Sequence, residues 1–181
     1  MMEVRIIQST EVPKKLEQSR IGRMTVSSLA QKYLQLEEKE IIFEKDKNGK
    51  PFLKGMENFY FNISHSDRYV VCAVSDEPVG VDVEKIRPVK LKLADRFFTE
   101  PERRYMYSAE NEARQYQRFF EIWTRKEAFV KMDGRGLRIS LDSFDVITPE
   151  EGVSYLCVHQ DEEMVCHVCT KKEQGIVLDK K

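Results

Sequence analysis

The chain has 181 residues, of which 41% are apolar and 34% are charged, and its formal net charge is −1 at pH 7. Such a chain can bury a hydrophobic core as one domain or as two small halves packed together. The near-neutral charge argues against bulk binding to nucleic acid, and no apolar run approaches the roughly 18 residues of a membrane span. The N-terminus lacks the apolar core of a signal peptide, and the four cysteines do not make a secreted disulfide framework, so we expect a cytoplasmic protein.

The first half of the sequence predicts, in chain order, a short strand, one helix and three strands of a single sheet. Apolar residues recur at roughly helical spacing in the helix, and turn residues separate the strands. The charged segment before the sheet contains the turn Asn48–Gly49 and ends at Pro51. The expected elements are residues 4–7, Lys14 to Leu36, 59–66, 68–75 and 79–85.

The second half predicts helices followed by a return of the β-rich pattern. Thr99 is a candidate N-cap, and Pro101 stands where the first helical turn tolerates a missing N–H. The order helix, sheet, helices, sheet predicts an α+β fold of two similar halves. The expected helices are residues 100–111 and 114–132, and the expected β segments are 143–148, 153–159 and 163–170.

Two acidic residues lie two positions apart in the apolar stretch VGVDVEK, residues 79–85. In a strand the valines of this stretch share the buried face, and Asp82 and Glu84 lie together on the opposite face. Two carboxylates side by side repel each other, so we expect a positive charge between them. The alternative is that both carboxylates simply face solvent.

A second group of charged residues lies in the helix expected over 114–132. Glu127 and Lys131 are four residues apart, so they stack along one stripe of the helix. Such a pair is also common as a weak ion pair on helix surfaces. If Glu127 faces the two carboxylates of the strand, the three make an all-oxygen site suited to Mg²⁺, which would neutralise the repulsion. Lys126 and Lys131 are then placed to hold phosphate oxygens.

Five short motifs carry a resemblance to a known family. They are GKP (49–51), FNISHS (61–66), VGVDVEK (79–85), RFF (96–98) and WTRKEAFVK (123–131). In this order and spacing the sequence resembles the 4′-phosphopantetheinyl transferases, of the type that activates peptide and polyketide synthases. The resemblance implies the α+β fold of that family, a monomer of two similar halves related by pseudo-twofold symmetry. We place the halves at residues 1–84 and 85–181, with coenzyme A in the cleft between them.

The resemblance implies an enzyme that transfers the 4′-phosphopantetheine arm of coenzyme A to a serine of an acyl or peptidyl carrier protein. Adenosine 3′,5′-bisphosphate is the product left behind. The resemblance further implies that Asp82, Glu84 and Glu127 hold Mg²⁺ against the pyrophosphate. Glu127 is also the best-placed base for the serine proton, and because a metal-bound carboxylate is a poor base, the division between these two roles stays open. Lys131 is expected to contact the phosphates as a point charge.

Further residues are expected to bind coenzyme A by the same resemblance. Ser64 and His65 match positions that bind its phosphates, although as neighbours in a strand they face opposite ways and cannot form a catalytic dyad. Without the resemblance, His65 is an ordinary histidine at a sheet edge. The expected coenzyme A contacts are Lys50, Pro51, Ser64, His65, Lys126, Lys131 and Ser19.

Two features depart from the simplest picture. The stretch before the first helix is shorter than is usual in the family, where part of the 3′-phosphate site lies. Lys14, Lys15, Arg20 and Arg23 are candidates to replace it, the alternative for at least two of them being solvated charges on the helix. The cysteines and histidines of residues 157–169 resemble a zinc cluster by composition. In a strand, however, Cys166 and Cys169 face opposite sides, which favours packed free thiols.

Two other functions would use the same residues. A Mg²⁺-dependent phosphohydrolase would use the carboxylates with water as the nucleophile. A non-catalytic coenzyme A-binding module would keep the fold without the chemistry. Retention of the three carboxylates together with Lys131 argues against the binding module. The excess of Lys and Arg between Lys85 and Arg104 predicts a surface for an acidic carrier domain.

Overall fold

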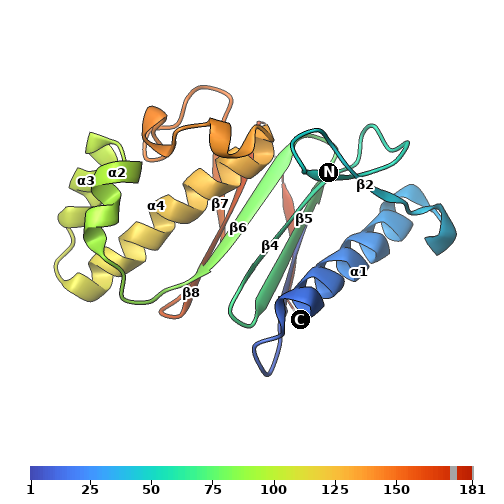
Figure 1. The fold of residues 1–181 in the computed structure, drawn as a ribbon, viewed down its shortest axis with the longest axis horizontal. Coiled ribbons are helices and arrows are strands. Elements are labelled where there is room, and N and C mark those ends of the chain that lie inside the picture. Colours follow the sequence, from blue (N-terminus) through green and yellow to red (C-terminus); the bar gives the residue numbers. More distant parts are fainter. Residues whose placement is uncertain (172–174, 181) are drawn as a thin grey trace.

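The computed structural model describes residues 1–171 and 175–180, apart from the side chain of Leu137. Two sheets lie next to each other, and one long helix covers the outer face of each (Figure 1). The arrangement confirms the predicted α+β fold of two similar halves. None of the described helices is long and apolar enough to cross a membrane.

The first sheet has the strand order β4-β5-β1-β9 and carries helix α1 (Lys15–Leu34) on its outer face. Strand β9 pairs in parallel with β1, so the end of the chain joins the sheet of the N-terminal half. A two-stranded sheet of β2 and β3 lies in the loop that follows α1. The strands are β1 (Met2–Gln8), β2 (Phe43–Lys45), β3 (Pro51–Leu53), β4 (Tyr60–Ser66), β5 (Tyr69–Ser75) and β9 (Ile176–Lys180).

The second sheet has the order β6-β8-β7 and is antiparallel throughout. Helix α4 packs across it, and two shorter helices pack at the far end of α4 (Figure 1). The predicted β segments 153–159 and 163–170 form an antiparallel hairpin in this sheet, β7 and β8. The elements are β6 (Val79–Lys85), α2 (Ala94–Phe97), α3 (Glu100–Tyr107), α4 (Glu112–Asp133), β7 (Ser154–Gln160) and β8 (Met164–Thr170).

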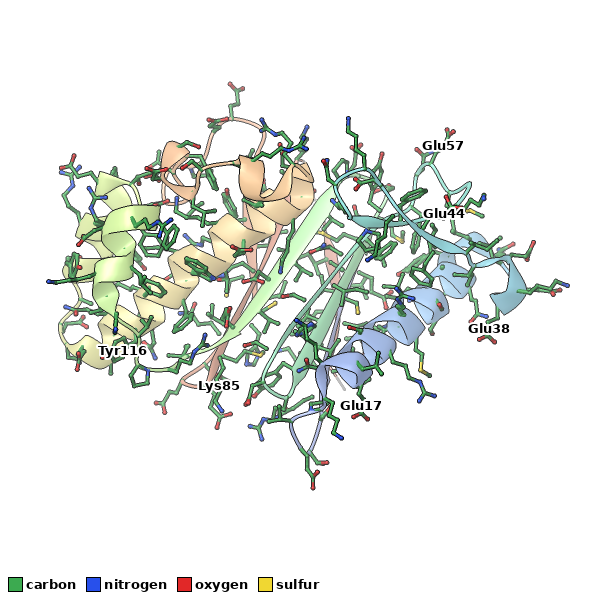
Figure 2. All side chains as sticks on the ribbon, viewed as in Figure 1. Glu17, Glu38, Glu44, Glu57, Lys85 and Tyr116 are labelled. Carbon is green, nitrogen blue, oxygen red and sulfur yellow. The ribbon has the colours of Figure 1, made fainter. Side chains whose placement is uncertain are left out.

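The two sheets share a core of β-branched side chains that joins their inner faces. Val4 and Val71 of the first sheet lie in one buried cluster with Val81 of the second sheet. The valines of β6 therefore face this core, as the sequence predicts, and leave Asp82 and Glu84 on the side toward α4. Side chains fill the space between the layers, and Lys85 ends β6 at the rim of the molecule (Figure 2).

The prediction that residues 79–85 form a third strand of the first sheet is wrong. Strand β6 pairs with β8, and it meets β4 through side chains instead of a backbone ladder. Asn62 Oδ1 accepts a hydrogen bond from the N–H of Val81 at 2.9 Å. Ser64 Oγ and Ser66 Oγ accept from the N–H groups of the alternate residues Val83 and Lys85, at 3.4 and 3.1 Å. These polar side chains satisfy backbone donors that a neighbouring strand would otherwise take, so the sheet divides here. We call this boundary the β4–β6 seam.

The predicted β segment at residues 143–148 is also wrong, because this stretch forms a 3₁₀ turn, Leu141–Ser143, followed by bends. Side-chain carboxylates take its backbone donors. Asp145 accepts from the N–H groups of Ile147 and Thr148, and Glu102 of α3 accepts from the N–H of Val146. No ladder is therefore needed to satisfy this segment.

We expect Gly80→Ala to lower the free energy of unfolding by about 3 kcal/mol, the upper range for overpacking a tight contact. A Cβ at Gly80 would lie 2.0 Å from the carbonyl oxygen of Ala128 and 2.4 Å from the amide nitrogen of Met132, so β6 and α4 would have to separate. Urea denaturation measures the change. Gly175→Ala, whose Cβ meets no atom within 4 Å, is the matched control. Equal stability of the two variants would contradict this packing.

Candidate active site

The acidic pair of β6 lies along the β4–β6 seam and is held there by serines. Ser64 Oγ donates a hydrogen bond to Asp82 Oδ1 at 2.8 Å, and Ser66 Oγ donates to Glu84 Oε2 at 3.1 Å. Asp82 is buried and Glu84 is half-buried. The same serines that join β4 to β6 therefore also orient the two carboxylates.

The positive charges expected beside this pair come from two different residues. Lys131 Nζ of α4 lies 2.5 Å from Asp82 Oδ1 and 3.0 Å from Ser64 Oγ. Arg87 Nη1 lies 3.2 Å from Glu84 Oε2. Each carboxylate thus has its own cationic partner, and Lys131 links the helix directly to the strand.

Glu127 contributes the third carboxylate, one turn before Lys131 on α4. Burial raises the pKa of Glu127, the charges of Asp82 and Glu84 raise it further, and Lys131 opposes them. Among the described residues, none forms a hydrogen bond or ion pair with the Glu127 carboxylate. Glu127 therefore lies close enough to Asp82 and Glu84 for their charges to raise its pKa, and no described cation forms an ion pair with it.

The three carboxylates supply the hard oxygen donors that Mg²⁺ prefers. Asp82 Oδ2 is buried and has no hydrogen-bond partner among the described residues, which leaves it suited to a cation. In the part of the chain that the structure describes, however, no three His, Cys, Asp or Glu side chains stand close enough together to enclose a metal ion. The residues fit the chemistry of such a site, and their convergence on one ion stays a prediction.

A cavity of about 320 Å³ opens between the seam and the end of α4. Its walls include Lys50 and Pro51 together with Glu127 and Lys131, so it gathers four of the predicted site residues. Lys50 Nζ donates to the carbonyl oxygen of Lys131 at 2.6 Å, and burial lowers the pKa of Lys50. This lysine ties the loop before β3 to the C-terminal end of α4.

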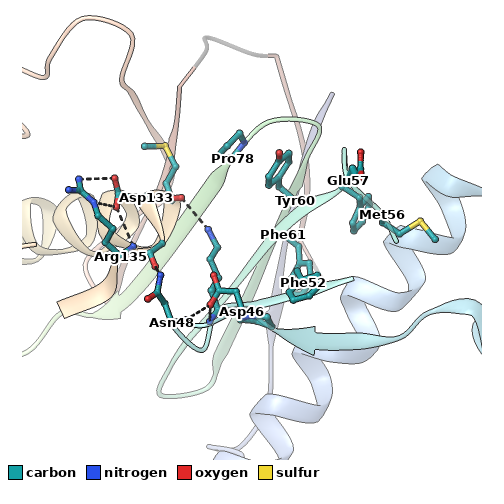
Figure 3. Close-up of a pocket in the computed structure, with 15 residues that line it drawn as sticks. Asp46, Asn48, Phe52, Met56, Glu57, Tyr60, Phe61, Pro78, Asp133 and Arg135 are labelled. Atoms are coloured by element: carbon teal, nitrogen blue, oxygen red, sulfur yellow. Dashed lines mark hydrogen bonds and ion pairs between the residues drawn. The ribbon is translucent and has the colours of Figure 1, made fainter. Parts of the chain in front are cut away.

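A second cavity, of about 420 Å³, shares the Lys50–Pro51 wall with the first (Figure 3). Phe52 and Tyr60 form part of its apolar side. The ion pair of Arg135 with Asp133, at 2.6 Å, lies on its opposite side (Figure 3). The two cavities therefore share lining residues, and together their walls are both apolar and charged.

Ser64 and His65 face opposite sides of β4, as the sequence predicts. The Ser64 hydroxyl donates to Asp82 and accepts from Lys131 and from the N–H of Val83. His65 is half-buried on this edge strand, where burial and then the charge of Lys131 lower its pKa. In this structure Ser64 therefore holds the seam and His65 does not share its partners.

Two predicted residues, Lys126 and Ser19, neither line this cavity nor bond to the residues of the seam. Lys126 is fully buried, its Nζ lies 2.8 Å from Glu102 Oε2, and it donates to the carbonyls of Leu141 and Phe144. Lys126 therefore stabilises the 3₁₀ turn Leu141–Ser143 from below, and we leave it out of the proposed phosphate site. Ser19 is exposed on α1 and lines a separate hollow of about 850 Å³.

Sequence reasoning missed the roles of Asn62, Ser66 and Glu102. Polar residues at 62, 64 and 66 alternate with period two, and this pattern indicates one polar face of the strand. Glu102 has no such local signal, because its partner lies on another helix. The cysteine interpretation agrees with the structure, since Cys166 lies in the core between the sheets and Cys169 packs toward Met132 of α4.

Two similar α+β halves with carboxylates and lysines at their junction define a candidate phosphate-handling enzyme. The family model of the 4′-phosphopantetheinyl transferase superfamily matches residues 78–178, and the model of the N-terminal part of 4′-phosphopantetheinyl transferases matches residues 3–77. The chain belongs to the 4′-phosphopantetheinyl transferase superfamily.

Curated relatives extend over most of the chain. The chain is 39% identical over 150 residues to the 4′-phosphopantetheinyl transferase psf-1 of Bacillus pumilus. This match covers 83% of the chain and 64% of the relative. It is 38% identical over 135 residues to the 4′-phosphopantetheinyl transferase Sfp of Bacillus subtilis, covering 73% and 58%. The 4′-phosphopantetheinyl transferase HetI of Nostoc sp. is 34% identical over 137 residues, covering 72% and 57%. The chain thus spans about three fifths of the length of these relatives.

We expect Lys126→Met to lower the free energy of unfolding by about 3–5 kcal/mol, because it leaves Glu102 buried without its cation. Lys54→Met, which breaks an exposed pair with Glu44, should change the free energy of unfolding far less. Urea denaturation of both variants measures the difference. A loss of coenzyme A affinity at unchanged stability in Lys126→Met would place this lysine at the phosphates after all.

We expect the free energy of unfolding of the wild type, compared with that of Glu127→Gln, to fall as the pH rises from about 4 to 7. An acid whose pKa is raised in the folded state binds its proton more tightly there, so it favours folding at low pH and opposes it once ionised. Urea denaturation across this range, with a chelator present, gives the trend. The exposed Glu110→Gln is the matched control, and a parallel pH trend for both variants would contradict the raised pKa.

Proposed function

We propose that this protein transfers the 4′-phosphopantetheine arm of coenzyme A to a serine of an apo acyl or peptidyl carrier protein. Family membership supports the reaction, and the single observation that carries it is the cavity that unites Glu127 and Lys131 with Lys50 and Pro51. We further propose that the protein acts as a monomer, since one chain supplies both halves of the site. We also propose that it acts in the cytoplasm.

Coenzyme A would lie along the seam with its phosphates near Lys131. The Lys131 ammonium group already compensates Asp82 at 2.5 Å, so it is placed to share its charge with a phosphate oxygen. Lys50 and Pro51 would contact the nucleotide part, because each of them lines both cavities. His65 lies on β4 next to Ser64, close enough to Lys131 for the charge of that lysine to lower its pKa.

The reaction forms a phosphodiester between the carrier serine oxygen and the phosphorus that bears the pantetheine arm. The bond from that phosphorus to the bridging oxygen breaks, and adenosine 3′,5′-bisphosphate leaves. Glu127 would accept the serine proton, for which its raised pKa makes it a stronger base. Lys131 would stabilise charge on the phosphates as the bond breaks.

Asp82, Glu84 and Glu127 are the residues that would hold Mg²⁺. When bound, Mg²⁺ would polarise the pyrophosphate and neutralise charge on the leaving group. The partnerless oxygen Asp82 Oδ2 supports this assignment, and Ser64 and Ser66 would keep the two strand carboxylates in place.

The carrier would dock where basic and apolar side chains are exposed together beyond β6. Leu93 and Tyr107 are 41% and 44% exposed, which is high for large apolar residues. Lys92 and Arg104 lie on the same stretch and are also exposed. An acidic helical carrier domain would match this combination.

We expect the mass of an apo carrier protein incubated with this protein, coenzyme A and Mg²⁺ to rise by one phosphopantetheine arm. Asp82→Ala and Glu127→Ala should abolish the gain while circular dichroism shows them folded, and a chelator should stop the wild-type reaction. Glu110→Ala, an exposed glutamate, should keep the activity.

Other results of this assay would contradict the transferase. Release of the bisphosphate without any carrier would indicate a phosphohydrolase. Retained coenzyme A affinity with no product would indicate a binding module.

A further inference from the structure

His167 lies in the middle of β8 and is 1% exposed beneath α4. In the antiparallel pairing of β6 with β8 it stands directly opposite Asp82. Opposed residues of such a pair share one face of the sheet, so His167 and Asp82 both point toward α4. A buried imidazole needs hydrogen-bond partners, and this one finds them on the helix.

Both ring nitrogens of His167 bond to neighbouring residues of α4. Arg125 Nε donates to His167 Nε2 at 3.3 Å, so the ring carries its proton on Nδ1. That nitrogen donates to Thr124 Oγ1 at 2.8 Å. The Thr124 hydroxyl in turn donates to the carbonyl of Phe120 at 2.7 Å. Burial and the charge of Arg125 lower the pKa of His167 to about 3, so the ring stays neutral and the bonding pattern does not change near neutral pH.

The partner of His167 shares a stripe of α4 with the candidate catalytic residues. Thr124, Glu127 and Lys131 are spaced i, i+3 and i+7, which places them on one face of the helix. Thr124 is tied to His167 on β8, and Lys131 is tied to Asp82 on β6. The two ties therefore flank Glu127 along the helix.

Apolar packing alone would hold α4 less specifically. The close approach at Gly80 to the backbone of Ala128 sets the distance between helix and strand. Packing of this kind tolerates small rotations and shifts, whereas hydrogen bonds lose strength steeply when their geometry changes. The bonds of His167 to Thr124 and Arg125 thus add a directional constraint on α4 within one turn before Glu127.

We propose that His167 is a positioning residue which, through Thr124 and Arg125, fixes the rotation and axial position of α4 and so the place of Glu127 opposite Asp82 and Glu84. This inference rests on the proposed transferase activity. His167 does not contact the substrate, and its effect on the reaction passes through the helix.

Steady-state kinetics of paired variants test the proposal. Thr124→Val keeps the side-chain shape and removes the hydroxyl, and His167→Leu removes the ring nitrogens. Both should lower kcat by roughly 10- to 100-fold, with KM for coenzyme A changed less than about threefold, because a small displacement of a catalytic group costs rate more than binding. Thr124→Ser and His167→Gln, which keep hydrogen-bonding groups, should recover most of kcat.

The matched control is Cys166→Ala, which alters the neighbouring residue of β8 but faces the core between the sheets. It should lower the melting temperature and leave kcat within about twofold of wild type.

Three results would overturn the positioning role. These are kcat within twofold of wild type in both Thr124→Val and His167→Leu, equal loss of kcat in Thr124→Val and Thr124→Ser, or a raised KM at unchanged kcat. If the wild-type protein itself transfers nothing, the proposed function fails and this inference fails with it. If the wild type is active and Thr124→Val and His167→Leu are equally active, only this inference is rejected and the proposed function stands.

Discussion

The site depends on the polar side chains of β4 that replace a backbone ladder at the seam. A side chain between two strands holds them further apart than the roughly 4.8 Å of a paired sheet, so the two halves remain joined while space is left beside them. Asn62, Ser64 and Ser66 satisfy the backbone of β6, and the two serines also bond Asp82 and Glu84. The same serine side chains therefore join the two halves and orient the two carboxylates.

The charges around the seam are nearly but not fully balanced. Asp82 has Lys131 and Glu84 has Arg87, whereas Glu127 lies half-buried near both acids without a described partner. This remaining negative charge favours a cation or a proton. Lys50 and Lys131 line the same cavity and favour an anion. A site that attracts both suits a metal–pyrophosphate complex better than either ion alone.

Local patterns in the sequence predicted the elements and the face on which the acids lie, because period-two and helical spacing are local properties. They did not predict that β6 leaves the first sheet, since valines facing a core look the same whichever strand is the neighbour. Lys126 was misplaced for a similar reason. Its partner Glu102 lies on α3, and nothing near position 126 in the sequence indicates that pairing.

A crystal structure of the protein with coenzyme A and Mg²⁺ bound tests the central claim most directly. The account predicts the pyrophosphate beside Lys131 in the cavity at the seam, with the cation in contact with Asp82 and Glu127. Coenzyme A bound in the separate hollow on α1, or a Glu127 side chain turned away from both acids of β6, would contradict it.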